Sequence, residues 1–579
     1  MYGDRYISLA PLSLPSVRAR VESFLAANSL RLDDVDCYAT ITRSEDSDEI
    51  LAGGGLKGNV IKCIAVSPEL RSEGLSGSLV SYLVGLAHER GCDTVKVFTK
   101  PENTAIFSSM GFVTLAACDK AVLMEDGNGL RRYERYLASL RKEGRNGAIV
   151  MNANPFTRGH RYLVESAASQ VDNLYVIAVK EDLSRLPYAE RLAMIKAGTA
   201  DIPNVTVCEG SDYAISAATF PTYFLKKLSD ASDTQMSLDI DLFAKHIAPA
   251  LGVSVRFAGS EPADPLTARY NELMSELLPG AGVEFMEISR LEDGERPVSA
   301  TLLRKALDRG SLSEAMKFAY RSTLPYLVAD LAEAALRQEL DTTPKPGLVD
   351  RNNSGAHSDM DYDSMSAGIR ALRPWFVRMA VDAARGLDPA KIKEAGIEAE
   401  KSMLEATGGV NSHKGALFCV GLTVAAASFL AATEGGVTER KLRPLLTQAA
   451  SGIAAANGTH GAGVISKYRV KGALESAREA YPELFSEWLP WYRSLEGDRY
   501  RNHKTLLKIM TVLDDTNVLH RGGGEALARV KRDAAALLGD FSESRLAELD
   551  RQYISANISP GGSADMLSLT IFISTIINN

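Results

Sequence analysis

The sequence predicts a chain of several domains: an α+β N-terminal domain, a central α/β domain with a parallel sheet, and an all-α C-terminal domain. Three observations lead to this fold class. The chain has 579 residues, and single hydrophobic cores stop growing at about 250–300 residues. Short apolar runs alternate with helical patterns up to about residue 325, which is typical of strands connected by helices. Beyond that point, long Ala- and Leu-rich helical segments replace the strand-like runs.

The first domain is predicted over residues 1–127. Its clearest part is an apolar strand at 60–68, a polar turn, an amphipathic helix and a second strand at 93–99. The turn reads RSEGLS, from Arg71 to Ser76. This order resembles the Gcn5-related N-acetyltransferase fold, whose R-x-x-G-x-G/A loop holds the pyrophosphate of acyl-CoA at a helix N-terminus. Because Ser76 replaces the last glycine or alanine and no catalytic base stands out, we expect the fold without acyl transfer.

Residues 128–145 form a polar, Arg-rich amphipathic segment, which predicts a connecting helix. The central domain is predicted over 146–325. It opens with an uninterrupted apolar run at 147–151, the pattern of a strand buried in a parallel sheet. Repeated strand–helix units predict a doubly wound, Rossmann-like sheet. The further strand-like runs lie at 174–179, 205–208, 253–258 and 283–288.

The loop after the first central strand carries the first candidate site. It reads NPFTRGH, from Asn154 to His160, where open α/β sheets bind ligands beyond the carboxyl ends of their strands. Gly159 lets the backbone approach a phosphate, and the positive end of the following helix favours an anion. His160 can donate to α-phosphate oxygens and stabilise the charge that develops as pyrophosphate leaves. Thr157 offers a hydroxyl, and Asn154 and Phe156 belong to the same predicted ATP site.

A second element strengthens the prediction of a nucleotide site. Ser299 and Thr301 stand at a predicted helix start, and Arg304 follows one turn later. Hydroxyls, backbone N–H groups and a guanidinium suit a triphosphate, because arginine pairs with phosphate oxygens in a bidentate way. A strand-end loop and one helical arginine also suit contacts to the nucleotide, although an ordinary turn and a surface arginine explain them equally well. These residues are Gly259, Glu261 and Arg191.

The two elements resemble the (H/T)xGH and I-S-S-T-x-x-R motifs of the nucleotidylyltransferase superfamily, with Thr157 in the first position, Val298 for Ile and Ala300 for the second Ser. An acetyltransferase-like domain followed by GAIVMNANPFTRGHRYLVE resembles the citrate lyase ligase family over residues 1–325. That resemblance implies AMP-forming activation of acetate by attack on the α-phosphorus of ATP. The thiol of the citrate lyase acyl carrier protein then takes the acetyl group. It also implies Mg²⁺ on the leaving pyrophosphate.

The third domain is predicted over 326–579, with helical segments at 326–340, 392–406, 416–432 and 542–553. Polar segments, most of them with glycine, interrupt these helices and predict a shared polar cavity. Asp359 and Asp363 would share one helix face, and carboxylates at this spacing can hold Mg²⁺ through oxygen ligands. The six polar segments lie at 343–352, 357–363, 408–415, 457–463, 514–523 and 559–565.

The segments TPKPGLVDRxNxGAHxDMD, GVNSHKG, DDTNVLHRGG and SPGGSADML resemble the triphosphoribosyl-dephospho-CoA synthase family over about residues 331–579. The resemblance implies that the ribose 2′-hydroxyl of 3′-dephospho-CoA displaces adenine at C1′ of ATP. The triphosphate stays intact. Such a reaction needs a carboxylate base, stabilisation of an oxocarbenium-like centre and cations around the phosphates.

On this resemblance we assign catalytic roles to two acids of the first polar segments, Asp359 and Asp361. Four carboxylates are assigned to Mg²⁺: Asp359, Asp363, Asp514 and Asp515. Six residues are expected to contact ATP or its phosphates: Lys345, Asn411, His413, Lys414, His460 and Arg521.

Composition narrows the range of partners. The formal net charge of −8 gives no global attraction to nucleic acid or to anionic membranes. The six cysteines show no CxxC or zinc-ligand spacing, which indicates a reducing compartment. The N-terminal sequence lacks the pattern of a secretory signal, and we expect no membrane-spanning segment. A cytoplasmic enzyme with small anionic substrates is therefore expected.

Two other functions remain open at this point. The central domain could be a cofactor adenylyltransferase, in which a phosphorylated pantetheine-like molecule attacks ATP and the product is a dinucleotide. Alternatively, the chain could be a non-catalytic acyl-CoA sensor or scaffold. Product analysis separates these functions from a ligase, which releases AMP and forms a thioester.

Overall fold

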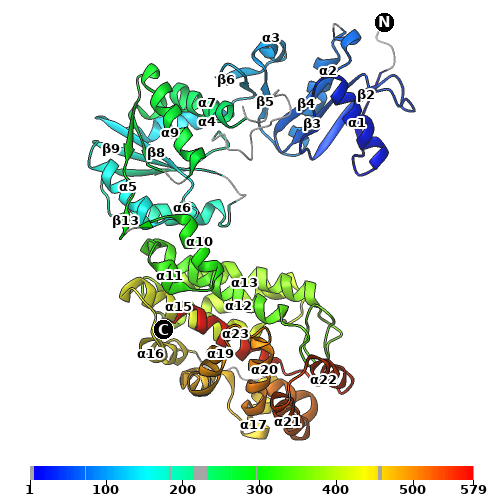
Figure 1. Ribbon diagram of the computed structural model, residues 1–579, viewed down its shortest axis with the longest axis vertical. Helices are drawn as coiled ribbons and strands as arrows, with labels where there is room; N and C mark the ends of the chain where they lie inside the picture. The colour runs from blue at the N-terminus through cyan, green and yellow to red at the C-terminus, as the bar shows by residue number, and fades with distance from the viewer. Residues whose placement is uncertain are drawn as a thin grey trace. The chain divides into compact units, whose positions relative to one another are not determined.

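The computed structural model describes residues 5–71, 73–180, 184–213, 231–261, 264–294, 296–453 and 460–577. The chain divides into two compact units. Unit 1 comprises Met1–Asn154 and Gly159–Pro297, and unit 2 comprises Pro155–Arg158 and Val298–Asn579. The elements of each unit are labelled in Figure 1. The chain thus changes unit within the loop at 154–160 and again just before the helix that begins after Ser299.

The N-terminal part of unit 1 is built on one sheet. Its strands are β1 (Tyr6–Ala10), β2 (Cys37–Thr42), β3 (Ala52–Lys57), β4 (Val60–Val66), β5 (Val95–Thr99), β6 (Val113–Ala117) and β7 (Val122–Asp126). Its helices are α1 (Pro15–Ala27), η1 (Pro68–Leu70), α2 (Leu75–Glu89), η2 (Pro101–Asn103) and α3 (Thr104–Ser109). The strand order is β1-β2-β3-β4-β5-β7-β6. Every neighbouring pair is antiparallel except β4 and β5, which run parallel and pair only near Val60 and Ile61.

The second sheet of unit 1 is parallel throughout. Its strands are β8 (Asn146–Met151), β9 (Asn173–Ala178), β10 (Val205–Cys208), β11 (Val253–Gly259) and β12 (Glu284–Ile288). They lie in the order β10-β9-β8-β11-β12. The chain therefore starts in the centre at β8, runs outward to β10 and returns to β11 on the other side. This reversal between β8 and β11 is the topological switch point of a doubly wound sheet, and the predicted parallel α/β arrangement is confirmed.

Helices and short elements complete this part of the chain. They are α4 (Gly129–Leu140), α5 (Arg158–Ala168), α6 (Tyr188–Thr199), α7 (Ala231–Leu242), the π-helical turn η4 (Phe243–Ile247), α8 (Ala248–Leu251), α9 (Pro265–Leu277), η5 (Pro279–Ala281), β13 (Glu292–Asp293) and β14 (Arg296–Pro297). The predicted connecting helix is α4, which buries Leu130 and Leu137 and exposes its arginines. One apolar cluster links Leu115 and Leu123 of the first sheet, through α4, to Tyr175 of the second. The two sheets of unit 1 therefore share a core.

Unit 2 is helical in its described part, as predicted. Its helices are α10 (Ala300–Asp308), α11 (Leu312–Met316), η6 (Arg321–Thr323), α12 (Leu324–Asp341), α13 (Tyr362–Ala383), α14 (Pro389–Ala406), α15 (Lys414–Glu434), α16 (Glu439–Ser451), α17 (His460–Tyr468), α18 (Ala473–Arg478), η7 (Leu484–Trp488), α19 (Leu489–Ser494), α20 (Arg501–Val512), α21 (Thr516–Gly539), α22 (Glu543–Ser555) and α23 (Gly561–Ile576). The sequence predicted a domain boundary after 325, whereas unit 2 begins at Val298. Leu303 and Leu312 explain the difference, because α10 and α11 bury them in the helical core.

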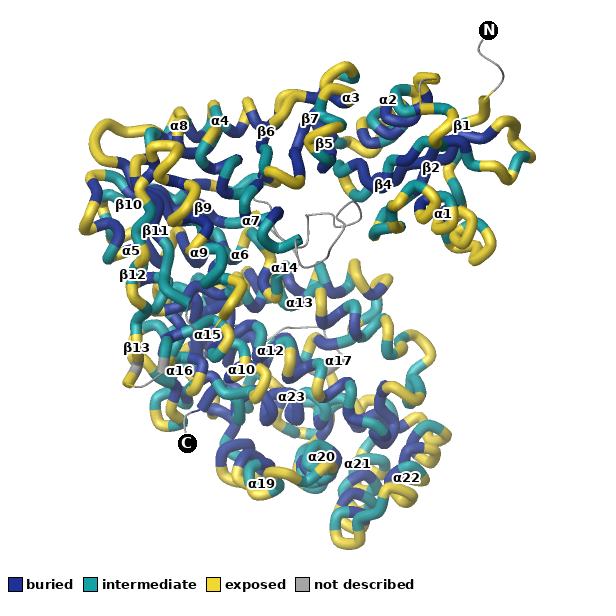
Figure 2. The backbone as a smooth tube through the Cα atoms, turned by 45° about the horizontal axis from the view of Figure 1, so that its top comes forward, coloured by how far each residue is buried: buried dark blue, intermediate teal, exposed yellow. Residues whose placement is uncertain are grey.

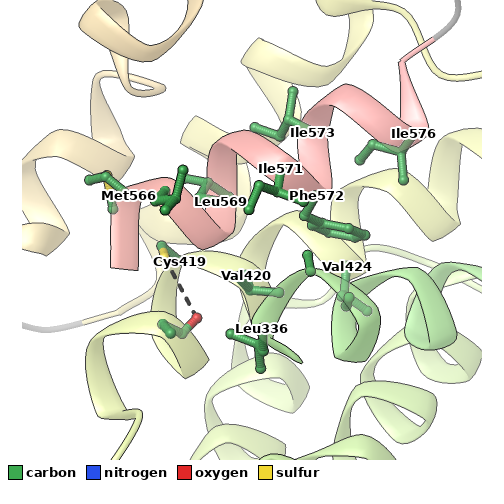
Figure 3. Close-up of a cluster of buried hydrophobic side chains, with 14 of the residues drawn as sticks. Leu336, Cys419, Val420, Val424, Met566, Leu569, Ile571, Phe572, Ile573 and Ile576 are labelled. Atoms are coloured by element: carbon green, nitrogen blue, oxygen red, sulfur yellow. Dashed lines mark hydrogen bonds between the residues drawn. The ribbon is translucent and has the colours of Figure 1, made fainter. Parts of the chain in front are cut away.

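The core of unit 2 lies around α12, α15 and α23, which are mostly buried (Figure 2). Figure 3 shows how Leu336 of α12, Val420 and Val424 of α15 and Phe572 of α23 pack together. Truncating a buried side chain of this size to alanine typically costs about 2–5 kcal/mol. One polar segment follows α12, and others precede α15 and α23, so this core positions all three segments.

Helix α15 is long and apolar enough to cross a membrane by length and composition, with a mean hydropathy of 2.0 over its most apolar window. This differs from the expectation drawn from the sequence. However, 78% of that window is buried inside the protein, and the helix packs against α12, α13 and α23. Helix α15 is therefore the central core helix of unit 2.

Candidate active sites

A buried arginine anchors the strand ends at the first candidate site in unit 1. Arg191 of α6 is 0% exposed. Its guanidinium donates to the backbone oxygens of Asn152 at 2.7 Å, Val179 at 2.9 Å and Leu186 at 3.1 Å. It therefore ties together the segments that follow β8 and β9. The sequence left a nucleotide contact and a surface arginine equally open for Arg191. The structure shows it buried and bound to the backbone beside the strand ends, because a buried guanidinium needs several acceptors.

Asn154 and His160 lie at the two ends of the predicted loop in unit 1. The Asn154 Oδ1 accepts a hydrogen bond from the backbone N–H of Leu186 at 3.3 Å. His160 stands in the first turn of α5 and is half-buried. Burial and the nearby charge of Arg290 lower the pKa of His160 to about 4. The imidazole is therefore neutral near pH 7 and can donate one N–H to an oxyanion without carrying charge into the site.

The loop after β11 lies on the other side of the switch point from the loop after β8. Ser260 donates its backbone N–H to the Ile288 oxygen at 2.9 Å, and its Oγ accepts from the Arg290 N–H at 3.2 Å. The Arg290 guanidinium forms an ion pair with Glu261. A side chain at Gly259 would meet no atom within 4 Å, so space is open there. Sequence analysis missed Arg290, which the polar loop after β12 supplies.

Phe156 and Thr157 belong to unit 2 and are buried there. Phe156 is 0% exposed and makes an edge contact with Tyr320, with 5.8 Å between the ring centroids. Its backbone oxygen accepts a hydrogen bond from the Thr323 hydroxyl at 2.5 Å. Thr157 is 1% exposed and pairs with Ala319 in an isolated antiparallel bridge. These contacts make Phe156 an anchor of the loop rather than an exposed surface for adenine.

The start of α10 presents the second predicted nucleotide element, also in unit 2. Ser299 is its N-cap, and the Ser299 Oγ accepts from the Leu302 N–H at 3.1 Å. The Thr301 hydroxyl accepts from the Arg304 guanidinium at 3.0 Å. Thr301 is exposed and Arg304 is half-buried. A hydroxyl, a guanidinium and the positive helix end thus lie together, which is a suitable combination for a phosphate.

Three predicted segments of the helical unit meet around Arg521. Its Nη1 donates to the Ala356 oxygen at 2.6 Å and to the Asn557 Oδ1 at 2.9 Å. Its Nη2 lies 3.1 Å from the His357 Nδ1. The His357 Nε2 in turn lies 2.8 Å from the Ser559 Oγ. The structure thus joins residues separated by about 200 positions, and Ser559 was not among the predicted site residues.

The hydrogen bonds fix the state of His357. A guanidinium only donates, so the His357 Nδ1 is an acceptor and the Nε2 carries the hydrogen that Ser559 accepts. Burial and Arg521 lower the pKa of His357, while Asp359 acts in the opposite direction. Asp359 is exposed, with its Oδ1 3.7 Å from the His357 Nδ1. Among these groups, Asp359 keeps a carboxylate that is free to approach a substrate.

A second cluster holds the start of α23 against α21 and α15. Asp515 caps α21 and also accepts from the Ser563 N–H at 2.8 Å and the Ser563 hydroxyl at 2.9 Å. The Asp565 carboxyl accepts from the Ala416 N–H at the start of α15. A Cβ at Gly415 would stand 2.0 Å from the Asp565 Oδ2, so only glycine fits there. Burial, Asp515 and Glu339 raise the pKa of Asp565 well above its usual value.

Lys345, a predicted phosphate contact, forms a buried ion pair in the structure. Lys345 is 1% exposed, and its ammonium donates to the Glu339 Oε1 at 2.5 Å and to the Glu339 backbone oxygen at 2.9 Å. Its backbone N–H donates to the Asp350 Oδ2 at 2.9 Å. The sequence showed a lysine beside two prolines, but it could not show that the helix end before it supplies a carboxylate. In this arrangement Lys345 holds the turn after α12.

The segment before α15 is partly exposed. The Asn411 Oδ1 accepts from the Lys414 N–H at 3.1 Å, and the Lys414 ammonium pairs with Glu400 at 2.6 Å. His413 is 4% exposed and contacts the Ser412 hydroxyl through Nδ1 at 2.9 Å. Burial, with Lys345 nearby, lowers the pKa of His413 to about 3. The predicted contact of the His460 side chain lies outside the described residues.

The carboxylates assigned to Mg²⁺ are not gathered in the structure. Asp359, Asp363 and Asp514 are exposed, and Asp514 pairs with Lys531 at 2.6 Å. Both oxygens of Asp515 accept hydrogen bonds from the protein, as described above. Asp361 is the N-cap of α13 and forms a capping box with Ser364. Across the described ranges, no group of three or more His, Cys, Asp or Glu residues is arranged to hold a metal ion.

Two family models match the chain. Residues 146–327 match the citrate lyase ligase C-terminal domain, and residues 325–579 match ATP:dephospho-CoA triphosphoribosyl transferase. A citrate (pro-3S)-lyase ligase of Escherichia coli (strain K12) is 41% identical over 56% of this chain and 95% of its own length. The corresponding protein of Klebsiella pneumoniae is 44% identical over 55% of this chain and 94% of its own length.

The second half has relatives of a different kind. A protein of Pseudomonas paraeruginosa (strain DSM 24068 / PA7), named probable 2-(5''-triphosphoribosyl)-3'-dephosphocoenzyme-A synthase, is 40% identical over 44% of this chain and 92% of its own length. Among solved structures, NadR protein in complex with NAD and AMP-PNP aligns with a TM-score of 0.24 and 12% identity over 46% of this chain and 79% of that chain. That value is too low to support an inference.

Neither family is a cofactor adenylyltransferase or a non-catalytic sensor, so those alternatives are not favoured. Both families consist of enzymes, and the two matches adjoin near residues 325–327. The chain belongs to the citrate lyase ligase family in its first part and to the ATP:dephospho-CoA triphosphoribosyl transferase family in its second, and it joins the two enzymes in one polypeptide.

Proposed function

We propose that the first part of the chain is an AMP-forming ligase that uses acetate, ATP and the thiol of the citrate lyase acyl carrier protein. One observation carries this proposal: His160 and the loop with Gly259 and Glu261 follow β8 and β11, the two strands that flank the switch point. Doubly wound sheets bind their ligands at that edge. The name of the Escherichia coli relative, a ligase of citrate (pro-3S)-lyase, supports the same activity.

The proposed reaction has two steps. An oxygen of acetate attacks the α-phosphorus of ATP, and the bond from that phosphorus to the α–β bridging oxygen breaks. Pyrophosphate is released, and acetyl-adenylate is formed. His160, neutral because its pKa is lowered to about 4, donates an N–H to an α-phosphate oxygen as charge develops. The motif resemblance assigns Thr301 and Arg304 to the phosphates of ATP. The carrier thiolate then attacks the acetyl carbonyl, AMP leaves, and a thioester forms.

Mg²⁺ is expected to enter this site with ATP. The described part of the chain offers no cage of three or more acidic, His or Cys side chains. Mg²⁺ usually keeps several waters and binds through substrate phosphates together with one or two carboxylates. When bound, it would neutralise charge on the pyrophosphate. The residues present fit an ion held mainly by the nucleotide.

Acetate-dependent exchange between ATP and labelled pyrophosphate tests the first step without a carrier. We expect exchange in the full chain, and we expect His160→Ala to lower its rate by about 10²–10³, the usual effect of removing one oxyanion donor. Arg440→Ala, at an exposed position of unit 2, is the control and should keep the wild-type rate. Formation of a dinucleotide instead of AMP and thioester would refute the proposal.

We propose that the second part of the chain makes 2'-(5''-triphosphoribosyl)-3'-dephospho-CoA. The ribose 2'-hydroxyl of 3'-dephospho-CoA attacks C1' of ATP, the bond from C1' to adenine breaks, and the hydroxyl proton passes to a base. The convergence of three separate segments on Arg521, His357 and Ser559 carries this proposal. The name of the Pseudomonas relative supports it.

Asp359 is the proposed base of this reaction. The Nδ1 lone pair of His357 faces the Arg521 guanidinium and cannot take a proton, whereas the Asp359 carboxylate beside it is exposed. Arg521 and the exposed Lys414 are the proposed phosphate contacts, with Asn411 and His413 shaping the start of α15. Lys345 is left out of the proposed phosphate contacts and Asp515 out of the proposed Mg²⁺ ligands, because both side chains are buried as well as hydrogen-bonded within the protein.

Adenine release from ATP, with and without 3'-dephospho-CoA, tests this second activity. We expect Asp359→Asn to lower the rate by about 10²–10⁴, the usual contribution of general base catalysis. The matched control is Asp540→Asn, because Asp540 is an exposed acid beside Arg545 at a turn. Full activity of Asp359→Asn would remove Asp359 from the mechanism. Adenine release that does not depend on 3'-dephospho-CoA would contradict the proposed reaction.

The proposed organisation follows the sequence. Residues 1–127 form an acetyltransferase-like domain without acyl transfer, 128–145 connect it, 146–325 carry the nucleotidylyltransferase-like ligase and 326–579 carry the synthase. The shared core of the two sheets supports the N-terminal region as a fixed part of the ligase. We propose a cytoplasmic location, because both proposed reactions consume ATP and the cysteines at described positions are all free thiols.

A further inference from the structure

The surface of unit 1 has an open groove between α4 and the π-helical turn η4 with α8. Its volume is about 750 Å³, and its basic lining residues are Arg131 and Arg135 of α4 and Lys245 of η4. Figure 2 shows the exposed turns of α4 and α8 side by side. We call this feature the α4 groove. None of the roles proposed above uses it.

The two arginines of the α4 groove have no ionic partner among the described residues. Arg131 and Arg135 are exposed, and neither makes a hydrogen bond or ion pair with any residue that the structure describes. They stand four residues apart on one helix, where like charges repel each other. Such a pair costs stability in the free protein. The positive charge of this pair is opposite in sign to the formal net charge of −8 of the whole chain.

The acids of the α4 groove do not neutralise these arginines. Glu134 lies 2.7 Å from the His246 Nδ1, and the His246 Nε2 lies 2.8 Å from the Leu115 oxygen. Asp241 lies near the groove and pairs with Lys245 at 2.8 Å. His246 therefore joins the two walls of the groove. Because both walls are fixed in the free protein, a partner would lose little free energy in ordering them.

The α4 groove starts at the same edge of the parallel sheet as the proposed ligase site. Tyr133 of α4 donates its hydroxyl to the Glu209 oxygen at 3.1 Å, and Glu209 directly follows β10. A Cβ at Gly129, in the first turn of α4, would stand 2.1 Å from the Tyr213 hydroxyl. The N-terminal part of α4 therefore lies beside the carboxyl end of β10, an edge strand of the sheet.

We propose that the α4 groove docks an acidic surface of the thiol-bearing carrier protein. The inference rests on the proposed ligase function and adds the surface that recognises its protein substrate. Arg131 and Arg135 are side by side on a helix surface rather than directed to one point, which suits carboxylates spread along a partner helix better than a single small anion. Complementary charges of this kind at the rim of an interface raise association rates and make them depend on salt.

The test compares two double variants of the full chain. Arg131→Glu/Arg135→Glu reverses the charge of the groove, and Arg385→Glu/Arg440→Glu makes the same change in net charge at exposed arginines of unit 2 that also lack an ionic partner in the described structure. We expect the groove variant to raise the KM for thiol-form carrier about tenfold or more at low salt. The control variant should keep the wild-type KM. Both should keep the wild-type rate of acetate-dependent pyrophosphate exchange, which needs no carrier.

The outcomes separate the inference from the function on which it rests. If wild-type protein shows no acetate-dependent exchange, the ligase proposal fails. If exchange is normal but both double variants have the same KM for the carrier, the docking proposal fails. Polyglutamate should inhibit acetylation by the wild type and not by the groove variant. If inorganic phosphate at the same ionic strength inhibits equally well, the groove is a small-anion site and the proposal is refuted.

Discussion

The ion pair of Lys345 and Glu339 offers the clearest prediction about the helical unit. Both side chains are buried, and their charged atoms lie 2.5 Å apart. Burial raises the pKa of Glu339, and the charge of Lys345 opposes that shift. Lys345→Met removes the charge that stabilises the Glu339 carboxylate. It leaves an uncompensated buried acid near Asp350 and Asp565.

Removing one partner of a buried pair typically costs about 3–5 kcal/mol of unfolding free energy. The unfolding free energy of a large unit falls by about 3 kcal/mol per molar urea, so the urea concentration at the unfolding midpoint should drop by about 1 M or more. Replacing both residues, as Lys345→Met/Glu339→Leu, should recover most of this loss, because a buried pair and a packed apolar pair are often of similar stability. The deficit of the single variant should shrink as pH falls, because its folded state binds a proton on Glu339.

Tryptophan fluorescence during urea unfolding provides the assay. The three tryptophans of the chain, Trp375, Trp488 and Trp491, all lie in the helical part, so the signal reports on that unit within the full chain. The following result would refute a structural role for the Lys345 ion pair. If Lys345→Met unfolds at the wild-type urea concentration and instead raises the KM for ATP in adenine release, Lys345 binds phosphate as its sequence context suggested.

Three further predictions follow from single contacts. Gly415→Ala should displace the Asp565 carboxyl and abolish adenine release while acetate-dependent exchange stays normal, and retention of adenine release would show that this contact is dispensable. Asp565→Asn should stabilise the helical unit more at about pH 8 than at about pH 5, because an acid whose pKa is raised by folding makes the protein less stable as pH rises; an equal effect at both values would contradict the assigned shift. The rate of acetate-dependent exchange should show no His160 ionisation above about pH 5, and Arg290→Met should move that ionisation upward. An unchanged pH profile in Arg290→Met would show that Arg290 does not lower the pKa of His160.

Periodicity predicted the architecture of the described regions well. The apolar run at 147–151 became β8, and the runs at 205–208 and 253–258 became β10 and β11 with small shifts at the ends. Patterns of this kind depend on which faces are buried, and the parallel sheet and helical core bury both faces of their central elements. The unit boundary between Pro297 and Val298 was not predicted. The sequence of α10 shows an apolar face, but it does not show against which hydrophobic core that face packs.

The interaction partners of charged residues were harder to predict than the helices, strands or loops that carry them. Arg191 and Lys345 were expected to contact ATP, yet backbone carbonyls and Glu339 engage them inside the protein. Only the three-dimensional path of the chain brings those acceptors near. Arg521 and His357 were predicted on separate segments, and the structure brings them within hydrogen-bond distance. Ser559 lies in a segment that was predicted to line the cavity, but the sequence did not single it out from its neighbours. Arg290 was missed because a single arginine in a loop carries no pattern of its own.

The central claim is that the two parts of the chain break different bonds of ATP. The most direct measurement supplies ATP labelled in both adenine and the α-phosphate and analyses all products for wild type, His160→Ala and Asp359→Asn. With acetate and thiol-form carrier, the wild type should give AMP, which retains both labels. With 3'-dephospho-CoA, it should give free adenine and a product that keeps the α-phosphate. His160→Ala should lose only the first reaction and Asp359→Asn only the second. Loss of both reactions in either variant, or of neither, would contradict the account.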